Sequence, residues 1–148
     1  HVFAVEVARE HLETVYVDDP ESTVSEVVPY YDIDEQRRLD LAGVDADGNI
    51  VVAVEAERVN HDIRRAVPDD FDKIADCDVE EALWVVMTQS AGHDVLAALN
   101  DPPEGEPRVE KTYSKSTPPQ QFRLDTPGIT AMYPAEWLRD RLETESDS

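Results

Sequence analysis

The spacing of hydrophobic residues changes from helical to strand-like several times along the chain. In residues 2–14 apolar side chains recur every three or four positions, which predicts a helix. Residues 37–57, "RRLDLAGVDADGNIVVAVEAE", contain two strand-like runs around Asp47-Gly48, which predicts a hairpin with a two-residue turn. The run "IVVAV" is apolar on both faces, as expected of a central strand covered on two sides.

The rest of the chain continues the alternation of helices and strands. Residues 14–19 could form a short strand, and a strand or irregular excursion is expected before residue 37. A helix is predicted to open at Pro68, a buried strand to lie within 81–90, a short helix within 92–101 and a last helix to begin near Pro134. Residues 102–121 lack apolar periodicity and read as a long surface loop, and 122–133 would supply one or two strands. The pattern predicts an α/β or α+β class.

Length and cysteine content bear on the number of domains and on the redox compartment of the protein. A chain of 148 residues is long enough to bury one proper core, so we expect a single domain over 1–148. Its one cysteine, Cys77, cannot form an internal disulfide, which suits a reducing cytoplasm. No apolar run of about 18 residues predicts a membrane span. Because the chain begins at His1, we expect it to be a piece of a longer protein.

The acidity is spread over the whole chain. The formal net charge is −21, with 34 acidic residues and three lysines. A uniformly acidic, lysine-poor composition is typical of proteins from salt-loving archaea, where molar salt screens charges over about 3 Å. Under such conditions the lack of a basic patch counts less against DNA binding.

Several acids converge on the predicted hairpin. With the turn centred on Asp47-Gly48, Asp40 faces Glu55 and Arg38 faces Glu57, all on one face of the sheet. Carboxylates placed directly opposite each other are destabilising, so something should compensate. The candidates are a divalent cation, a shared proton or neighbouring arginines. Oxygen ligands of this kind suit Mg²⁺ or Mn²⁺.

The order of these motifs resembles the PD-(D/E)XK nuclease superfamily, nearest in pattern to archaeal Holliday-junction resolvases. The resemblance covers roughly residues 1–100 and rests on "VFAVEVAREHL", "RRLD" and "VEAE", which supply Glu6, Asp40 and Glu55. It implies a restriction endonuclease-like α/β fold, with a central mixed β-sheet flanked by helices. It also implies Mg²⁺ or Mn²⁺ held by Asp40, Glu55 and Glu6, DNA as the substrate, and a homodimer as in similar resolvases.

Two positions depart from the family pattern. Leu39 stands where a proline is common, and Glu57 stands where the motif lysine is expected. The missing cation could come from Lys73 on the following helix or from Arg38. The candidate catalytic set is therefore Asp40, Glu55, Lys73, Arg38 and Glu57; if no cation substitutes, the domain is a former nuclease kept for binding.

Other interpretations stay open at this level. The hairpin acids and Glu6 could be ordinary acidic surface, in an unrelated α/β domain or in a non-catalytic module that binds nucleic acid or protein. His61 could be a ligand, a proton carrier or a plain loop residue. The loop cations Arg108, Lys111 and Lys115, near Tyr113, could track nucleic acid or simply decorate the surface. Glycine-rich phosphate loops, G-x-S-x-G, CxxC and HExxH motifs do not occur.

Overall fold

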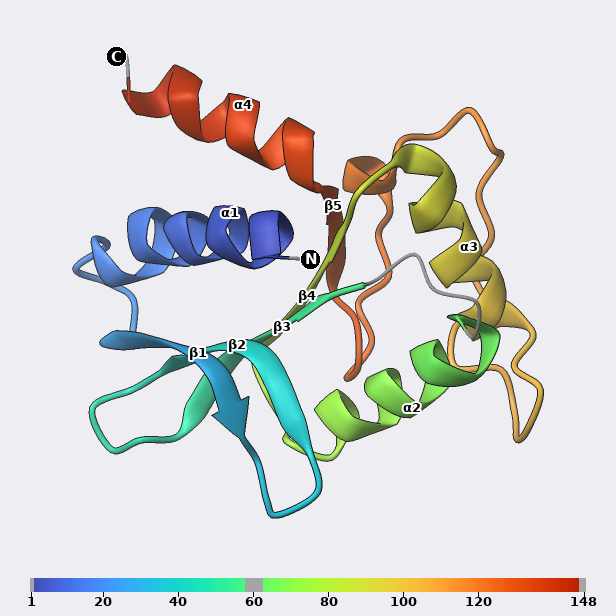
Figure 1. The fold of residues 1–148 in the computed structure, drawn as a ribbon, viewed down its shortest axis with the longest axis horizontal. Coiled ribbons are helices and arrows are strands. Elements are labelled where there is room, and N and C mark those ends of the chain that lie inside the picture. The colour runs from blue at the N-terminus through green and yellow to red at the C-terminus, as the bar shows by residue number, and fades with distance from the viewer. Residues whose placement is uncertain (1, 58–62, 147–148) are drawn as a thin grey trace.

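The computed structural model describes residues 2–57 and 63–146 (Figure 1). The helices and strands follow one another as α1 (Val2–Leu12), β1 (Glu26–Asp32), β2 (Arg38–Val44), β3 (Ile50–Ala56), α2 (Ile63–Ala75), β4 (Glu81–Val86), α3 (Gln89–Asn100), β5 (Ala131–Pro134) and α4 (Ala135–Ser146). A π-helical segment, Glu13–Val17, continues α1, and a short 3-10 helix, Pro119–Gln121, precedes β5.

A five-stranded mixed sheet runs through the centre in the order β1-β2-β3-β4-β5. Strands β1, β2 and β3 are antiparallel neighbours, whereas β4 and β5 run parallel to β3. Helices α1 and α4 cover one face and α2 and α3 the other (Figure 1). The prediction of an α/β fold with a mixed sheet flanked by helices is confirmed.

Side chains of the central strands alternate between two hydrophobic cores. On β4, Trp84 and Val86 pack under α2 and α3, whereas Leu83 and Val85 pack under α1 and α4. The same alternation along β3 turns Val54 toward α1. Glu55, the next residue, lies on the α2 side, where Lys73 contacts it.

The hairpin connection differs from the predicted two-residue turn. The loop runs over residues 45–49, where the Asp45 carboxylate accepts the N–H groups of Asp47 and Asn49 and Gly48 adopts a φ of 85°. A β-bulge between Gly43 and Val44 then shifts the pairing by one residue. The register beyond the bulge, with Leu41 opposite Val54, is the predicted one.

Two predicted elements were wrong. The segment that includes Glu13–Val17 continues the first helix as a π-helix and forms no strand, although its valines and tyrosine favour strands. Helix α2 is already formed at Ile63, so Pro68 lies inside it and not at its start. Pro68 removes one helical hydrogen bond, but its ring is buried against the core.

The edge and the loops complete the fold. Edge strand β1 contains Pro29, and the next residue, Tyr30, has a φ of 53°. Residues 102–118 are described without helix or strand, and the Asn100 amide ties them down by donating to the carbonyls of Val109 and Lys111. Within the described ranges, no helix has the length and apolar character needed to cross a membrane.

Candidate functional site

A cluster of charged groups lies between the sheet and α2. Its carboxylates come from Asp40 on β2, Glu55 at the end of β3, Glu57 just after it and Asp70 on α2. Its ammonium group comes from Lys73, one helical turn after Asp70. Residues far apart in the sequence thus meet because β2 and β3 are neighbours and α2 folds back over them.

Lys73 is the centre of this acidic cluster. Its Nζ forms an ion pair with Glu55 Oε1, donates to the Arg38 carbonyl at 2.8 Å and lies 3.2 Å from Asp70 Oδ1. An ammonium group has three N–H donors, so these three oxygens can use all of them. Lys73 is therefore held in place in this conformation by two strands and by its own helix.

Asp40 is fixed by the backbone of the neighbouring strand. The N–H of Ala56 donates to Asp40 Oδ2 at 2.9 Å, at the end of β3. This bond keeps the carboxylate of Asp40 next to Glu55, as the hairpin register predicts. Asp40 is half-buried, whereas Glu55 is only 4% exposed.

The cluster contains more carboxyl groups than cationic groups. Burial and the nearby carboxylates of Asp70 and Asp40 raise the pKa of Glu55 well above its ordinary value, although Lys73 opposes the shift. Burial also raises the pKa of Asp70. For Lys73, burial acts to lower the pKa, but the carboxylates of Glu55 and Asp70 outweigh it and the pKa rises. One ammonium group does not balance this many carboxylates.

Glu57 belongs to the same cluster although it occupies the position of the expected lysine. Burial, followed by the charges of Asp70 and Asp40, raises its pKa to about 8. Its backbone N–H donates to the Val85 carbonyl, which fixes the end of β3 beside β4. At neutral pH the side chain is therefore mostly protonated, and it adds less negative charge than its identity suggests.

Not every predicted residue reaches the cluster. Asp40, Glu55, Glu57 and Lys73 come together, whereas the guanidinium of Arg38 donates to Asp32 of β1 at 2.7 Å and is exposed. Only the Arg38 carbonyl contacts Lys73.

Glu6 also lies elsewhere. It is exposed on α1, which covers the opposite face of the sheet (Figure 1). There it lines a groove with Arg139 and Glu143 of α4. His61 lies outside the described residues.

Asp70 was missed by sequence reasoning. A signal was present, because Asp70 falls on the stripe of α2 that includes the buried residues Val67, Phe71 and Ile74. An acid at a core-facing helical position needs a partner, and Lys73 one turn later is that partner.

Two cations of the long loop, Arg108 and Lys111, are engaged within the protein. Arg108 donates to both carboxylate oxygens of Asp72 at 3.0 and 2.9 Å, and Lys111 Nζ donates to the Arg123 carbonyl at 2.6 Å. Tyr113 stacks on Phe122 with ring centroids 4.6 Å apart. These groups attach the loop to α2 and to the segment before β5.

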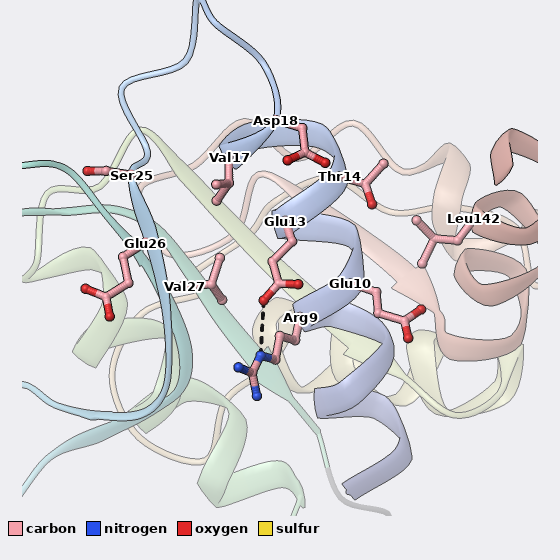
Figure 2. Close-up of a pocket in the computed structure, with 10 residues that line it drawn as sticks. All are labelled: Arg9, Glu10, Glu13, Thr14, Val17, Asp18, Ser25, Glu26, Val27 and Leu142. Carbon is pink, nitrogen blue, oxygen red and sulfur yellow. Dashed lines mark hydrogen bonds and ion pairs between the residues drawn. The ribbon is translucent and has the colours of Figure 1, made fainter.

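A wide groove of about 750 Å³ lies away from the cluster, between the end of α1 and β1 (Figure 2). Figure 2 shows Arg9 and Glu13 pointing toward each other, and their ion pair measures 3.2 Å. Glu10, Asp18 and Glu26 also line the groove. All of them are exposed or half-buried, so the groove lacks the desolvated charges that the α2 cluster has.

The donor set of the α2 cluster suits a hard divalent cation. Asp40 and Glu55 offer carboxylate oxygens, and Mg²⁺ is commonly held by one or two carboxylates together with water and substrate phosphate. Within residues 2–57 and 63–146, no three Asp, Glu, His or Cys side chains converge as a ready-made metal site.

No model of a protein family, no curated protein and no solved structure matches the chain.

Proposed function

We propose that this chain is a metal-dependent nuclease domain that hydrolyses DNA phosphodiester bonds. The observation that carries the proposal is the meeting of Asp40, Glu55 and Lys73 from two strands and a helix. Metal-assisted hydrolysis of a phosphodiester needs anionic ligands for the cation and a group that stabilises charge on the phosphate. The three residues are of the right chemical types for these two tasks.

The proposed mechanism assigns a task to each residue. Asp40 and Glu55 would hold Mg²⁺ or Mn²⁺, which when bound polarises the phosphate and lowers the pKa of a water molecule. Lys73 would donate to a phosphate oxygen and stabilise the negative charge that develops there. The Ala56 N–H keeps the Asp40 carboxylate oriented. Burial of Glu55 strengthens the charge interactions around it.

The charge of the chain bears on the conditions under which it would bind DNA. A formal net charge of −21 repels DNA at low salt, whereas molar salt screens that repulsion beyond about 3 Å. We propose that the protein works in a salt-rich archaeal cytoplasm. Nuclease assays therefore belong in molar KCl.

A second candidate function is a non-catalytic module that binds nucleic acid or a protein partner. Glu57 favours it, because this carboxyl group stands where a nuclease of the family carries its lysine. The ion pair of Lys73 with Glu55 and its two hydrogen bonds also favour it, since the ammonium must give up a contact before it can reach a phosphate. The two functions differ in whether DNA is cut once metal is bound.

The deciding experiment compares Asp40→Asn with Asp47→Asn in cleavage of linear and branched DNA, in molar KCl with Mn²⁺. Asparagine keeps an acceptor oxygen for the Ala56 N–H, so the Asp40 variant should fold. Asp47 is exposed in the hairpin loop and provides the matched control. We expect cleavage by the wild type and the control and none by Asp40→Asn. Full activity of a folded Asp40→Asn variant would contradict the assignment, and Mn²⁺ binding without any cleavage would favour the binding module.

A further inference from the structure

The cation of the cluster comes from a helix, and its neighbour on that helix is an acid. Asp70 and Lys73 are three residues apart on α2, and Asp70 Oδ1 lies 3.2 Å from Lys73 Nζ. Side chains at this spacing face each other on a helix. The side chain of Asp70 is 28% exposed and that of Lys73 13%, so the contact is shielded from solvent far better than a surface pair.

The oxygens around Lys73 differ in how they would respond to a bound cation. Glu55 is a proposed metal ligand, so a divalent cation on its carboxylate would compete with the ammonium group for the same oxygen. Asp70 and the Arg38 carbonyl are not in the proposed ligand set. They can keep their contacts with Lys73 while Glu55 changes partner.

A lysine needs such a tether because its side chain is long. Four methylene groups separate the ammonium from the backbone, and the free side chain samples many rotamers. Without a fixed partner, an ammonium group released from Glu55 would move toward solvent and away from the other charges. One carboxylate and one carbonyl are enough to hold it while leaving one N–H for a phosphate oxygen.

We propose that Asp70 is a positioning residue of this site, which holds the ammonium group of Lys73 beside Asp40 and Glu55 and leaves one N–H for the phosphate when the cation binds. The α2 pair Asp70 and Lys73 thereby supplies from a helix the cation that β3 lacks at Glu57. This inference rests on the proposed nuclease function for its catalytic consequence. The placement of Lys73 by Asp70 can be tested separately.

The first test follows the ammonium group itself. The chain has three lysines, so ¹⁵N-lysine labelling gives three side-chain signals, and Lys73→Met identifies the one of interest. We expect a slowly exchanging ammonium signal for Lys73 in the wild type, with and without Mg²⁺. Asp70→Ala should weaken it without Mg²⁺, where Glu55 and the Arg38 carbonyl still contact the ammonium group, and should abolish it with Mg²⁺, in a protein whose backbone spectrum stays folded. The control Asp69→Ala removes the same charge from the exposed side of α2 and should leave it intact. A Lys73 signal in Asp70→Ala that exchanges as slowly as in the wild type, with and without Mg²⁺, would overturn the proposal.

The second test is kinetic and uses the same variants. Loss of a preorganised charge should lower kcat of Asp70→Ala by roughly 100-fold, with KM within about threefold of the wild type and Asp69→Ala unaffected. An equal loss in both variants, or a change in KM alone, would overturn the positioning role. If the wild type cuts no DNA, the proposed function fails, and the lysine spectra still decide whether Asp70 holds Lys73.

Discussion

Lys73 of α2 and Glu55 of β3 form an ion pair that is nearly closed to solvent, with 13% and 6% of their side chains exposed. The pair joins a helix to the central strand of the sheet, at the point where the other carboxylates gather. Buried pairs add little net stability compared with well-packed apolar groups, but removing one partner leaves an uncompensated charge. Both stability and metal binding should therefore depend on this pair.

Replacing Lys73 by methionine should destabilise the fold. Glu55 would remain buried beside Asp40 and Asp70 without its cation, at a cost of about 3–5 kcal/mol at pH 7. Chemical denaturation measures the free energy of unfolding. The exposed Lys115→Met should change it by less than about 0.5 kcal/mol. Addition of Glu55→Gln to Lys73→Met should restore part of the loss, and equal stability of the two lysine variants would count against the pair.

The same lysine variant should bind Mn²⁺ more tightly. The ammonium group would compete with a bound metal for Glu55, and a positive charge a few ångströms away would repel the cation. We expect calorimetry in molar KCl to give a dissociation constant roughly tenfold lower for Lys73→Met and much weaker binding for Asp40→Asn. Unchanged affinity in both variants would mean that the cluster does not bind the metal.

Glu57 should make stability fall as pH rises. Its pKa is about 8 in the folded protein and ordinarily 4.5, so between these values the folded state keeps a proton that the unfolded state has released. The stabilisation is present below about pH 4.5 and is lost as pH rises toward 8, by up to about 4–5 kcal/mol. Denaturation between pH 5 and 9 with a chelator should show this slope.

Glu57→Gln should flatten that slope without removing it. Glu55 and Asp70 also have raised pKa values, so they contribute in the same direction. Glu35→Gln, at an exposed loop position, should leave the pH profile as it is in the wild type. A Glu57→Gln profile as steep as that of the wild type would show that the Glu57 carboxyl is not desolvated.

Gly128 should not tolerate even a methyl group. A Cβ at this position would lie 2.5 Å from Cδ2 of Phe71, a ring that packs in the core under α2. Gly128→Ala should lower the free energy of unfolding by about 1–3 kcal/mol, as overpacking does. The loss should be smaller in a Phe71→Leu background, and additivity of the two substitutions would argue against this contact.

Salt should stabilise the protein over a wide range. With a formal net charge of −21, the folded chain is under self-repulsion that added ions screen. The melting temperature should rise between about 0.1 M and 2 M KCl, most steeply at the low end, where the Debye length is about 10 Å. A melting temperature that does not respond to KCl would show that repulsion between the acidic side chains does not limit the stability of the fold.

The hydrophobic pattern predicted the helices and strands that have one apolar face and one polar face. The hairpin register was predicted correctly although the turn was not. The loop is longer than the predicted two-residue turn, and the bulge at Gly43 shifts the pairing by one residue and so restores the register. Such a bulge depends on packing against neighbouring residues and does not change the spacing of apolar residues in the sequence, so the sequence does not predict it. The π-helical residues carry strand propensity, and contacts with β1 and the sheet overrode it.

The candidate site was predicted where an acid breaks an apolar run. Glu55 attracts notice because it ends the most apolar strand, and Lys73 because it follows on the next helix. The β2–β3 pairing places Arg38 opposite Glu57, but β1 lies on the other side of β2 and offers Asp32. The guanidinium of Arg38 pairs with that carboxylate and not with the cluster. Asp70 was missed because the surrounding acids hide a helical stripe that is otherwise apolar.

The irregular edge strand also limits how a second β-sheet could join this one. Strand β1 would be the natural place for a second sheet to join, but Pro29 has no N–H to offer and Tyr30, at a φ of 53°, turns the backbone out of extended geometry. The opposite edge, β5, is only four residues long and ends in Pro134. A continuous intermolecular sheet is thus disfavoured at both borders, and any contact between two copies would have to be made by side chains.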